Sequence, residues 1–347
     1  MGIPSYCITL KVSISMQKLL ITGGAGFIGA HCIQLFLKKY PNYYIVNLDK
    51  LTYAARTSFA LQQKPNYYFV EGNIANFLLV EALFQKFNFD GVIHFAAESH
   101  VDRSIVDPLL FVKTNIEGTG VLLHAAYNHW FKAPRQSQHP NHRFVYVSTD
   151  EVYGSLDAHN RPFTEAATLA PSNPYSASKA AAECLVKSYN HTYGLHTVIT
   201  RSTNNYGRYQ HPEKLIPMVL KNALQTQSIP LHGDGSSIRD WLHVEDHCKA
   251  IDCLFHKGQS GQSYNIGSHE EQTNLQIASM ICQILDQLKP LYGRSYTSLI
   301  YFTSERIGQD KRYALDARKI KETLGWTPTI QLKAGIQELV RDYIQQN

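Results

Sequence analysis

The sequence predicts an α/β fold, a doubly wound parallel sheet with a smaller C-terminal domain. Three observations indicate this fold. Short apolar runs alternate with longer helical patterns from residue 17, a glycine-rich turn follows the first run, and the alternation loosens after about residue 201. Uninterrupted apolar runs are typical of strands buried on both faces, and their alternation with helices is typical of a parallel sheet.

The expected strands are Lys18–Thr22, Tyr43–Leu48, Tyr67–Val70, Gly91–Ala96, Arg143–Ser148 and His196–Thr200. The expected helices between them include Phe27–Tyr40, Phe77–Lys86, Pro108–Tyr127 and Pro174–Tyr193. The last helix has clear ends, because Asn173 can cap it, Pro174 suits its first turn and Gly194 can terminate it. Tyr264–Gly267 is expected to return to the sheet as a further strand. Residues 131–143 are expected to form a polar loop, and fewer helices are expected after residue 201.

Composition and charge exclude several classes of function. The chain has 347 residues, of which 44% are hydrophobic and 18% charged, as in ordinary globular proteins. Its net charge of +5 is small, and its Lys and Arg residues are scattered rather than clustered. This distribution excludes a nucleic-acid surface and suits a site for an anionic small molecule. No apolar run reaches the about 18–20 residues that a membrane span needs. Six isolated cysteines and 16 dispersed histidines predict no metal site, and the cysteines indicate a reducing, cytoplasmic compartment.

The turn after the first strand predicts a dinucleotide site of the Rossmann type. Gly23 permits the tight turn, Gly26 lets the backbone approach a pyrophosphate, and Gly29 allows close packing of helix on strand. Asp49 ends the next strand 20 residues after Gly29. Its carboxylate would accept hydrogen bonds from the ribose hydroxyls and repel a 2′-phosphate, so NAD is expected rather than NADP.

These motifs predict how the chain divides. Residues 16–203, joined by 241–268, are expected to form the NAD-binding domain. Residues 204–240 and 269–347 are expected to form the substrate domain. Residues 1–15 lack the basic region and cleavage pattern of a signal peptide, so we expect a disordered leader there.

Two groups of residues predict the chemistry. Tyr175 and Lys179 lie four apart on one face of a helix, so the ammonium group can lower the pKa of the phenol and prepare it as a base. Asp150 and Glu151 are adjacent, and two carboxylates in a partly desolvated cleft cannot both ionise easily. One pKa should therefore rise, and the pair can divide into an acid and a base. Such a pair suits the elimination of water from a sugar whose C4 has been oxidised, with Asp150 as acid to the C6 oxygen and Glu151 as base at C5.

The chain resembles the dTDP-glucose 4,6-dehydratase family, in the extended branch of the short-chain dehydrogenase/reductase superfamily. The motifs that carry the resemblance span residues 17–345 and include TGGAGFIG, AAESHVDRS, STDEVYG, YSASKAAAE, TRSTNNYG, PEKLIP, GDGSSIRDWLHVEDH and DKRYALD. The resemblance implies oxidation at C4, loss of water across C5–C6 and return of hydride to C6, in deoxysugar biosynthesis. It also implies a homodimer formed through a helix bundle, with Thr114–Tyr127 and Pro174–Tyr193 as the matching helices.

The resemblance assigns the site residues as follows. Catalysis is expected from Tyr175, Lys179, Thr149, Asp150 and Glu151, with Thr149 binding the reacting oxygen. The NAD site is expected to include Gly23, Gly26, Phe27, Ile28, Gly29, Asp49, Lys50, Leu51, Thr52, Asn73, Ile74, Ala96, Ala97, Ser99, Thr114, Tyr175, Lys179 and Asn205. The nucleotide-sugar site is expected to include Ser99, Thr149, Asn204, Lys214, Leu215, Pro230, His232, Arg239, Asn274, Arg306, Gln309 and Tyr313, with Arg239 on the diphosphate.

The sequence departs from the family pattern at several positions. Asn73 stands where an Asp is usual, and its amide oxygen can still accept a hydrogen bond from adenine. His232, Ile307 and Gln309 differ in segments expected to bind the nucleotide. Three alternatives therefore stay open: a 4,6-dehydratase of another nucleotide sugar such as UDP-glucose, a 4-epimerase, and a non-catalytic NAD-binding protein. A 6-deoxy product would exclude the epimerase.

Overall fold

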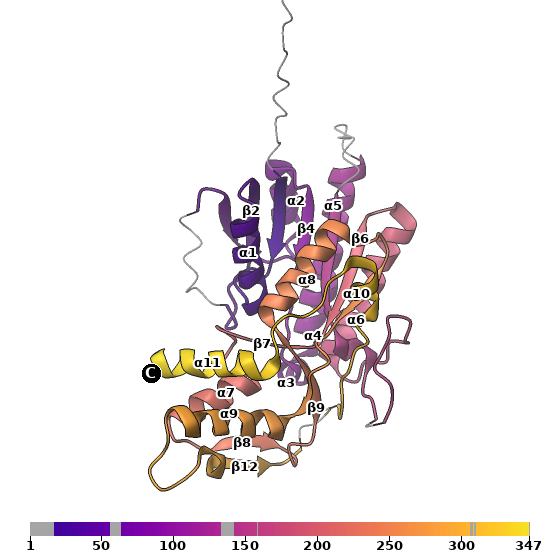
Figure 1. Ribbon diagram of the computed structural model, residues 1–347. Helices are drawn as coiled ribbons and strands as arrows, with labels where there is room; N and C mark the ends of the chain where they lie inside the picture. The colour runs from indigo at the N-terminus through magenta and orange to yellow at the C-terminus, as the bar shows by residue number, and fades with distance from the viewer. Residues whose placement is uncertain are drawn as a thin grey trace, which may run out of the picture.

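The computed structural model describes residues 17–55, 64–132, 142–157, 159–305, 308 and 310–346. The expected leader at 1–15, together with Arg306, Ile307 and Gln309, lies outside the described residues. The central feature is a seven-stranded sheet in the order β10-β6-β5-β4-β1-β2-β3 (Figure 1). Its strands are β1 (Gln17–Thr22), β2 (Tyr43–Asp49), β3 (Tyr67–Glu71), β4 (Gly91–His94), β5 (Arg143–Thr149), β6 (Thr197–Ser202) and β10 (Ser263–Ile266).

Every neighbouring pair in this sheet is parallel. The prediction of a parallel α/β sheet, including the returning strand beside β6, is confirmed. One predicted strand was too long, because β4 ends at His94 rather than Ala96. The pairing stops because β1 itself ends at Thr22: Phe95 N still donates to Thr22 O at 3.0 Å, but among the described residues Ala96 N has only the Thr22 side chain as a partner, at 3.4 Å.

Helices cover both faces of the sheet, because alternate strand residues point to opposite sides. Leu19 and Ile21 pack on α1 (Phe27–Lys39) and α8 (Val244–Lys257), with α10 (Arg318–Leu324) beside them. Leu20 packs on the other side against α2 (Phe77–Phe87), α5 (Gly118–Tyr127) and α6 (Pro174–Tyr193). Each fully buried leucine of this kind stabilises the fold by roughly 1.5–3 kcal/mol.

The ends of α6 agree with the prediction. The Asn173 side chain accepts a hydrogen bond from Ser176 N at 2.9 Å, and Ser176 Oγ completes a capping box with Asn173. Gly194 ends the helix with φ of +71°, a left-handed conformation that glycine adopts without strain. The start of α6 is therefore rigid, and Tyr175 and Lys179 lie on its first turns.

The predicted helix Pro108–Tyr127 is instead three segments. These are α4 (Pro108–Phe111), the π-helical η1 (Val112–Glu117) and α5, preceded by α3 (Val101–Val106) and followed by π-helical η2 (Asn128–Lys132). Within η1, the Asn115 amide donates to Glu98 O at 3.0 Å and to Ser178 Oγ at 2.8 Å, and it accepts from Glu98 N at 2.8 Å. This buried network accounts for the wider turn, since a π-bulge rotates a side chain relative to an α-helix. Phe131 and Lys132, expected in a loop, belong to η2.

The C-terminal part forms a smaller body at one end of the sheet (Figure 1). Its helices α7 (Leu215–Leu224), α9 (Asn274–Leu288) and α11 (Leu332–Gln346) share one hydrophobic core. Its strands form two small sheets from β7 (Asn204–Tyr206), β8 (Ile229–His232), β9 (Ile238–His243), β11 (Glu271–Thr273) and β12 (Ile300–Thr303). Two short 3₁₀ turns, η3 (Asp150–Tyr153) and η4 (Tyr296–Leu299), complete the described elements.

Fewer helices were expected after residue 201, and among the described elements six α-helices, α1 to α6, precede that residue. Five helices follow that residue among the described elements, α7 to α11. The apolar residues of α7, α9 and α11 recur at helical spacing and pack on the small sheets, as Ile277 and Ile281 of α9 do, whereas α8 and α10 pack on the large sheet. In the described part of the chain, no helix is long and apolar enough to span a membrane.

Candidate active site

A cavity opens at the carboxyl ends of the central strands, where the strand order reverses between β1 and β4. Parallel α/β sheets bind ligands at this place. Most of the predicted site residues line this one cavity: Gly23, Gly26, Phe27, Ile28, Gly29, Asp49, Lys50, Thr52, Ile74, Ala96, Ala97, Ser99, Thr114, Thr149, Asp150, Glu151, Tyr175, Lys179, Asn204, Asn205 and Lys214. The glycine turn and the candidate catalytic residues are therefore two ends of one pocket.

The glycine turn leaves no room for side chains at two positions. Gly23 has φ of +74°, and a Cβ there would lie 2.5 Å from Ala96 N. A Cβ on Gly29 would lie 2.3 Å from Gly23 O, whereas one on Gly26 would meet only Gly23 O, at 3.2 Å. At the start of α1 no side chain among the described residues caps the helix, so its first amides face the turn. A phosphate group fits such a cradle.

Asp49 braces this turn. Its carboxylate accepts from Ala25 N and from Leu51 N, both at 2.9 Å. Burial raises the pKa of Asp49, and these two hydrogen bonds oppose the rise. Each carboxylate oxygen has a second lone pair, so Asp49 can still accept from ribose hydroxyls. Beside it, Lys50 Nζ lies 2.7 Å from Glu98 Oε1, which ties the loop after β2 to the loop after β4.

Leu51 and Asn73, both predicted for the NAD site, do not line the cavity. Leu51 has a positive φ of 52° at the tight turn after Asp49. The Asn73 side chain accepts from Ala75 N at 2.9 Å, within its own turn. Asparagine and aspartate form this local hydrogen bond equally well, so the Asn at this position preserves the turn.

Thr149, Asp150 and Glu151 lie together where β5 ends in η3. Thr149 Oγ1 accepts from Glu151 N at 3.3 Å and donates to Asp150 Oδ1 at 3.2 Å. Asp150 is 2% exposed, and its Oδ2 has no hydrogen-bond partner among the described residues. Burial, and then the charge of Glu151, raise the pKa of Asp150 well above its usual range. As predicted, one carboxyl of the pair therefore favours its protonated form, which a general acid requires.

Tyr175 and Lys179 line the same cavity, as predicted. Burial and the charges of Glu151 and Asp150 raise the pKa of Tyr175, and a hydrogen bond with Thr149 opposes the rise. Lys179 Nζ donates to Val147 O at 2.7 Å and lies 4.2 Å from the centre of the Tyr146 ring. Burial lowers the pKa of Lys179 to about 7. Burial and the two carboxylates thus raise the pKa of Tyr175, and a lowering of the phenol's pKa by Lys179 stays a prediction.

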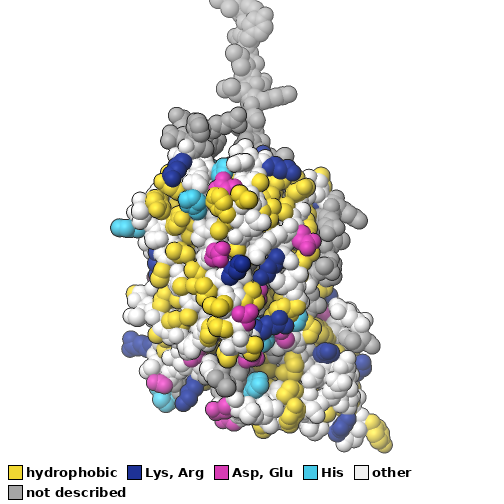
Figure 2. Space-filling model, turned by 180° about the vertical axis from the view of Figure 1, so that it is seen from behind, with side chains coloured by type: hydrophobic (Ala, Val, Ile, Leu, Met, Phe, Trp, Pro, Cys, Tyr) yellow, Lys and Arg dark blue, Asp and Glu magenta, His cyan; other side chains and the backbone are white. Residues whose placement is uncertain are grey.

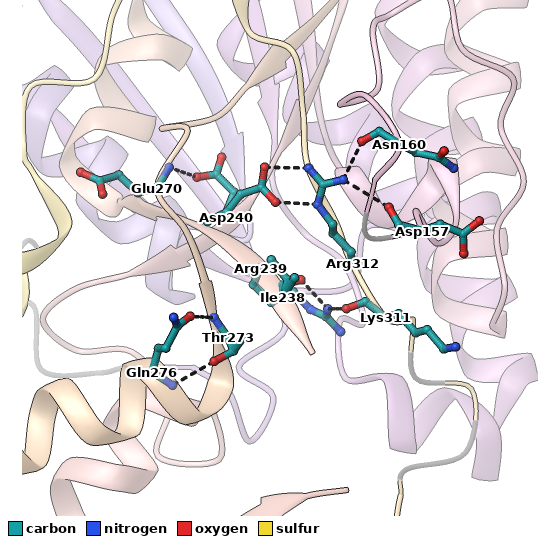
Figure 3. Close-up of polar contacts among 11 residues, drawn as sticks. Asp157, Asn160, Ile238, Arg239, Asp240, Glu270, Thr273, Gln276, Lys311 and Arg312 are labelled. Atoms are coloured by element: carbon teal, nitrogen blue, oxygen red, sulfur yellow. Dashed lines mark hydrogen bonds and ion pairs between the residues drawn. The ribbon is translucent and has the colours of Figure 1, made fainter. Parts of the chain in front are cut away.

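Arg239 and Tyr313 form a second cluster next to the carboxylate pair. Arg239 Nη1 donates to Ile238 O at 2.7 Å and to Lys311 O at 3.4 Å (Figure 3). Its Nη2 donates to Asp310 O at 2.8 Å. The guanidinium carbon lies 4.3 Å from the centre of the Tyr313 ring. Tyr313 donates its hydroxyl hydrogen to the Asp310 carboxylate. Arg239 also opposes the rise in the pKa of Asp150, which indicates that this cluster adjoins the cavity.

The structure places several predicted nucleotide-site residues outside the cavity lining. Leu215 packs on the core of the C-terminal part. His232 lies at the exposed end of β8, with Nδ1 3.3 Å from Ser304 O. Asn274 is the first residue of α9, behind a capping box between Thr273 and Gln276 (Figure 3). Pro230, Arg239 and Tyr313 also lie outside the lining, and Arg306 and Gln309 lie outside the described residues.

Sequence reasoning missed two sets of residues. Arg312 forms two hydrogen bonds with Glu271, at 2.6 and 2.9 Å, and also donates to Asn160 O at 2.6 Å, so it braces the segment that carries Tyr313 (Figure 3). His211 and Glu213 line the cavity from the loop before α7. The only signal for these two was their position beside Lys214. No group of three or more potential metal ligands occurs within the described ranges.

The chain is similar to known proteins over almost its whole length. A family model described as GDP-mannose 4,6 dehydratase matches residues 20–339. A dTDP-glucose 4,6-dehydratase of Haemophilus influenzae is 45% identical over 334 residues, which cover 95% of this chain and 98% of that protein.

Solved structures agree. The crystal structure of dTDP-glucose 4,6-dehydratase from Bacillus anthracis in complex with NAD is 40% identical, with a TM-score of 0.83, and covers 95% of this chain and 97% of that one. The dTDP-glucose 4,6-dehydratase from Streptomyces venezuelae, also with NAD bound, is 39% identical, with a TM-score of 0.84 over 95% of this chain and 98% of that one.

Proposed function

The chain belongs to the dTDP-glucose 4,6-dehydratase family, and we propose that it converts dTDP-glucose to dTDP-4-keto-6-deoxyglucose with NAD as cofactor. The observation that carries the proposal is the convergence of two acid/base systems on one cavity. Tyr175 and Lys179 supply the first, and Asp150 and Glu151 the second. A dehydrogenase needs only the first system, whereas a dehydratase needs both.

The residues present fit NAD. Gly23 and Gly29 leave backbone exposed at the start of α1, and Asp49 stands beside this turn for the ribose hydroxyls. When bound, NAD accepts a hydride from C4 of the sugar and returns it at C6. Tyr175 takes the proton of the C4 hydroxyl. The Thr149 hydroxyl, which donates to Asp150 Oδ1 in this structure, turns to that oxygen when the sugar binds. Lys179, which lines the same cavity, holds the cofactor's ribose.

The carboxylate pair performs the elimination. A C4 ketone makes the C5 proton acidic, and Glu151 removes it. Asp150, whose pKa burial raises, gives its proton to the C6 hydroxyl, which leaves as water. Glu151 then returns a proton to C5 while hydride is returned to C6. Transfer to Asp150 of the proton that Tyr175 took from the C4 hydroxyl, directly or through solvent, then restores both residues to their starting protonation states. The sum of these steps is the loss of one water without net oxidation.

Arg239 is suited to the diphosphate of the substrate. Three backbone contacts and the Tyr313 ring hold its guanidinium group in one orientation. A planar guanidinium group can bind two phosphate oxygens at once. Lys214 and Asn204 line the adjacent cavity wall and are placed to contact the nucleotide sugar.

The test is turnover of three nucleotide sugars by the purified protein, followed by mass spectrometry. dTDP-glucose, UDP-glucose and GDP-mannose would be incubated separately, and loss of one water would be scored. Water loss from dTDP-glucose is the expected result. Turnover of UDP-glucose instead would retain the mechanism but assign a different nucleotide, and failure with all three would refute the proposal.

The protein is further proposed to form a homodimer in the cytoplasm. Five apolar side chains are exposed on α3, α4 and η1, next to α6: Ile105, Val106, Leu109, Leu110 and Val112, of which Val106 is 86% exposed. Hydrophobic side chains also gather over the centre of the molecule when it is seen from behind (Figure 2). A second copy would cover such a patch. The described cysteines are all unpaired, as is typical of a reducing compartment.

Light scattering tests the dimer. The pair of substitutions Val106→Asp and Leu109→Asp should convert a dimer to a monomer, because two buried charges would oppose the contact. Tyr292→Asp, at an isolated and fully exposed residue, is the matched control. A monomeric unmodified protein would refute this part of the proposal.

A further inference from the structure

The loop of residues 207–214 joins β7 to α7 and contributes Gln210, His211, Glu213 and Lys214 to the lining of the cavity. Its first part is anchored on both sides. Arg208 Nε lies 2.8 Å from Asp342 Oδ2 of α11, and the Tyr209 ring lies 6.2 Å from the ring of His31 on α1. Gln210 donates to Asn205 O at 2.7 Å. The loop therefore lies against the helix whose first turn forms the phosphate cradle.

Glu213 connects this loop to two other loops. Its Oε1 accepts from the Tyr53 hydroxyl at 3.4 Å, and its Oε2 lies 3.5 Å from His100 Nε2. Tyr53 belongs to the loop after β2, and His100 precedes the first residue of α3 in the loop after β4. The guanidinium carbon of Arg103 lies 3.3 Å from the centre of the Tyr53 ring and holds that ring in place.

The connected loops both line the cavity. Thr52, Ala54 and Ala55 line it from the loop after β2. His211, Glu213 and Lys214 line it from the loop before α7. A dinucleotide lying between the glycine turn and Tyr175 would therefore lie against both loops, and Glu213 joins them through Tyr53.

The proposed reaction requires that NAD stay bound, which the contacts of Glu213 can support. The same cofactor molecule is needed in the first step and in the last, so an enzyme that loses it between them stops in mid-cycle. We propose that Glu213 is a positioning residue for cofactor retention, which slows NAD release by fastening the 207–214 loop to Tyr53 and His100. The purpose rests on the proposed function, but retention concerns NAD alone and can be measured without a sugar.

The experiment measures the rate of NAD release from the full-length protein. The protein is loaded with radiolabelled NAD and chased with excess unlabelled NAD, and the bound label is followed by rapid gel filtration. The variants are Glu213→Ala, Tyr53→Phe and the double variant. Glu322→Ala, an exposed glutamate on α10, is the matched control. Thermal unfolding without NAD verifies that each variant is folded.

Glu213→Ala should release NAD about three- to tenfold faster, because partly exposed contacts of this length contribute little each. Tyr53→Phe should give a smaller acceleration in the same direction. The double variant should be no faster than Glu213→Ala, since both changes remove one shared contact. Unchanged release from Glu213→Ala, or multiplied effects in the double variant, would overturn the inference. Normal dehydration by a variant with unchanged release would overturn the inference while leaving the proposed function intact.

Discussion

Asp150→Asn separates the two chemical stages of the proposed reaction. The amide has the shape of the carboxyl group and can still donate a hydrogen bond to the C6 oxygen, but it cannot release a proton. A positioned general acid contributes about 10²–10⁴ in rate. Asp150 is 2% exposed, so water cannot readily replace it, and we expect about a 10³-fold fall in product formation. That fall corresponds to about 4 kcal/mol at 1.36 kcal/mol per tenfold.

The assay follows two signals from the same sample. Mass spectrometry reports water loss, and the absorbance of the reduced nicotinamide reports oxidation at C4. Because Tyr175 and Thr149 are unchanged, oxidation should continue while elimination slows, and the reduced cofactor should accumulate on the enzyme. Asp157→Asn, the same chemical change at an exposed residue on the same segment, should behave as the unmodified protein. Normal water loss by Asp150→Asn would refute the assignment of Asp150 as the acid.

The same variant has a pH signature in stability. The pKa of Asp150 lies above the ordinary aspartate value of 3.8, so the folded chain holds this proton more tightly than the unfolded chain. The resulting stabilisation is complete below that ordinary value and is lost as pH rises through the folded-state pKa. The amide of the variant has no such proton to lose. The melting temperature of Asp150→Asn relative to the unmodified protein should therefore increase with pH above 3.8, and a constant difference would contradict the raised pKa.

Tyr175→Phe should abolish oxidation, with a loss of at least about 10²-fold and no reduced nicotinamide, because the C4 proton then has no acceptor; persistent absorbance change would contradict this. Arg239→Ala should raise KM for dTDP-glucose about 10- to 100-fold with a smaller effect on kcat, since a charge-assisted contact to phosphate contributes about 1.5–3 kcal/mol. Steady-state kinetics measure both constants, with Arg294→Ala, at an exposed arginine, as the control; an unchanged KM in Arg239→Ala would contradict the assignment. Gly29→Ala should abolish NAD binding, because its Cβ would lie 2.3 Å from Gly23 O; calorimetric titration with NAD measures this, and retained affinity would show that the turn can relax.

Much of the cofactor half could be predicted from local sequence patterns. The apolar runs around Leu19–Ile21 predict strands because a strand buried on both faces needs consecutive apolar residues. Gly23 and Gly29 predict the tight turn because only a residue without Cβ fits there. Asn173 and Gly194 mark the ends of α6 through capping hydrogen bonds to immediate neighbours. In each case the residues that determine the local structure lie within a few positions of it in the sequence.

The sequence by itself also determined that two carboxyl groups are adjacent, and adjacency alone predicts that one pKa must rise. Tertiary structure decided which of the two carboxyl groups is buried, because the turn η3 directs the Asp150 side chain into the protein. The same applies to Lys179, whose ammonium group is held by Val147 O from β5. Side-chain direction depends on partners supplied by other elements, and a helical spacing of four residues does not contain them.

The π-helical turn at 112–117 and the bridge at Glu213 were decided by tertiary structure alone. Asn115 is fixed by hydrogen bonds to Glu98 and to Ser178, which come from two other elements. Glu213 meets Tyr53 across 160 residues of sequence. The spacing of apolar residues indicates which face of an element is buried, but it does not indicate which distant polar groups the element will contact. The strands, caps and glycine turn were therefore determined locally, whereas the orientation of the catalytic groups and the closure of the cofactor site arise only when distant segments pack together.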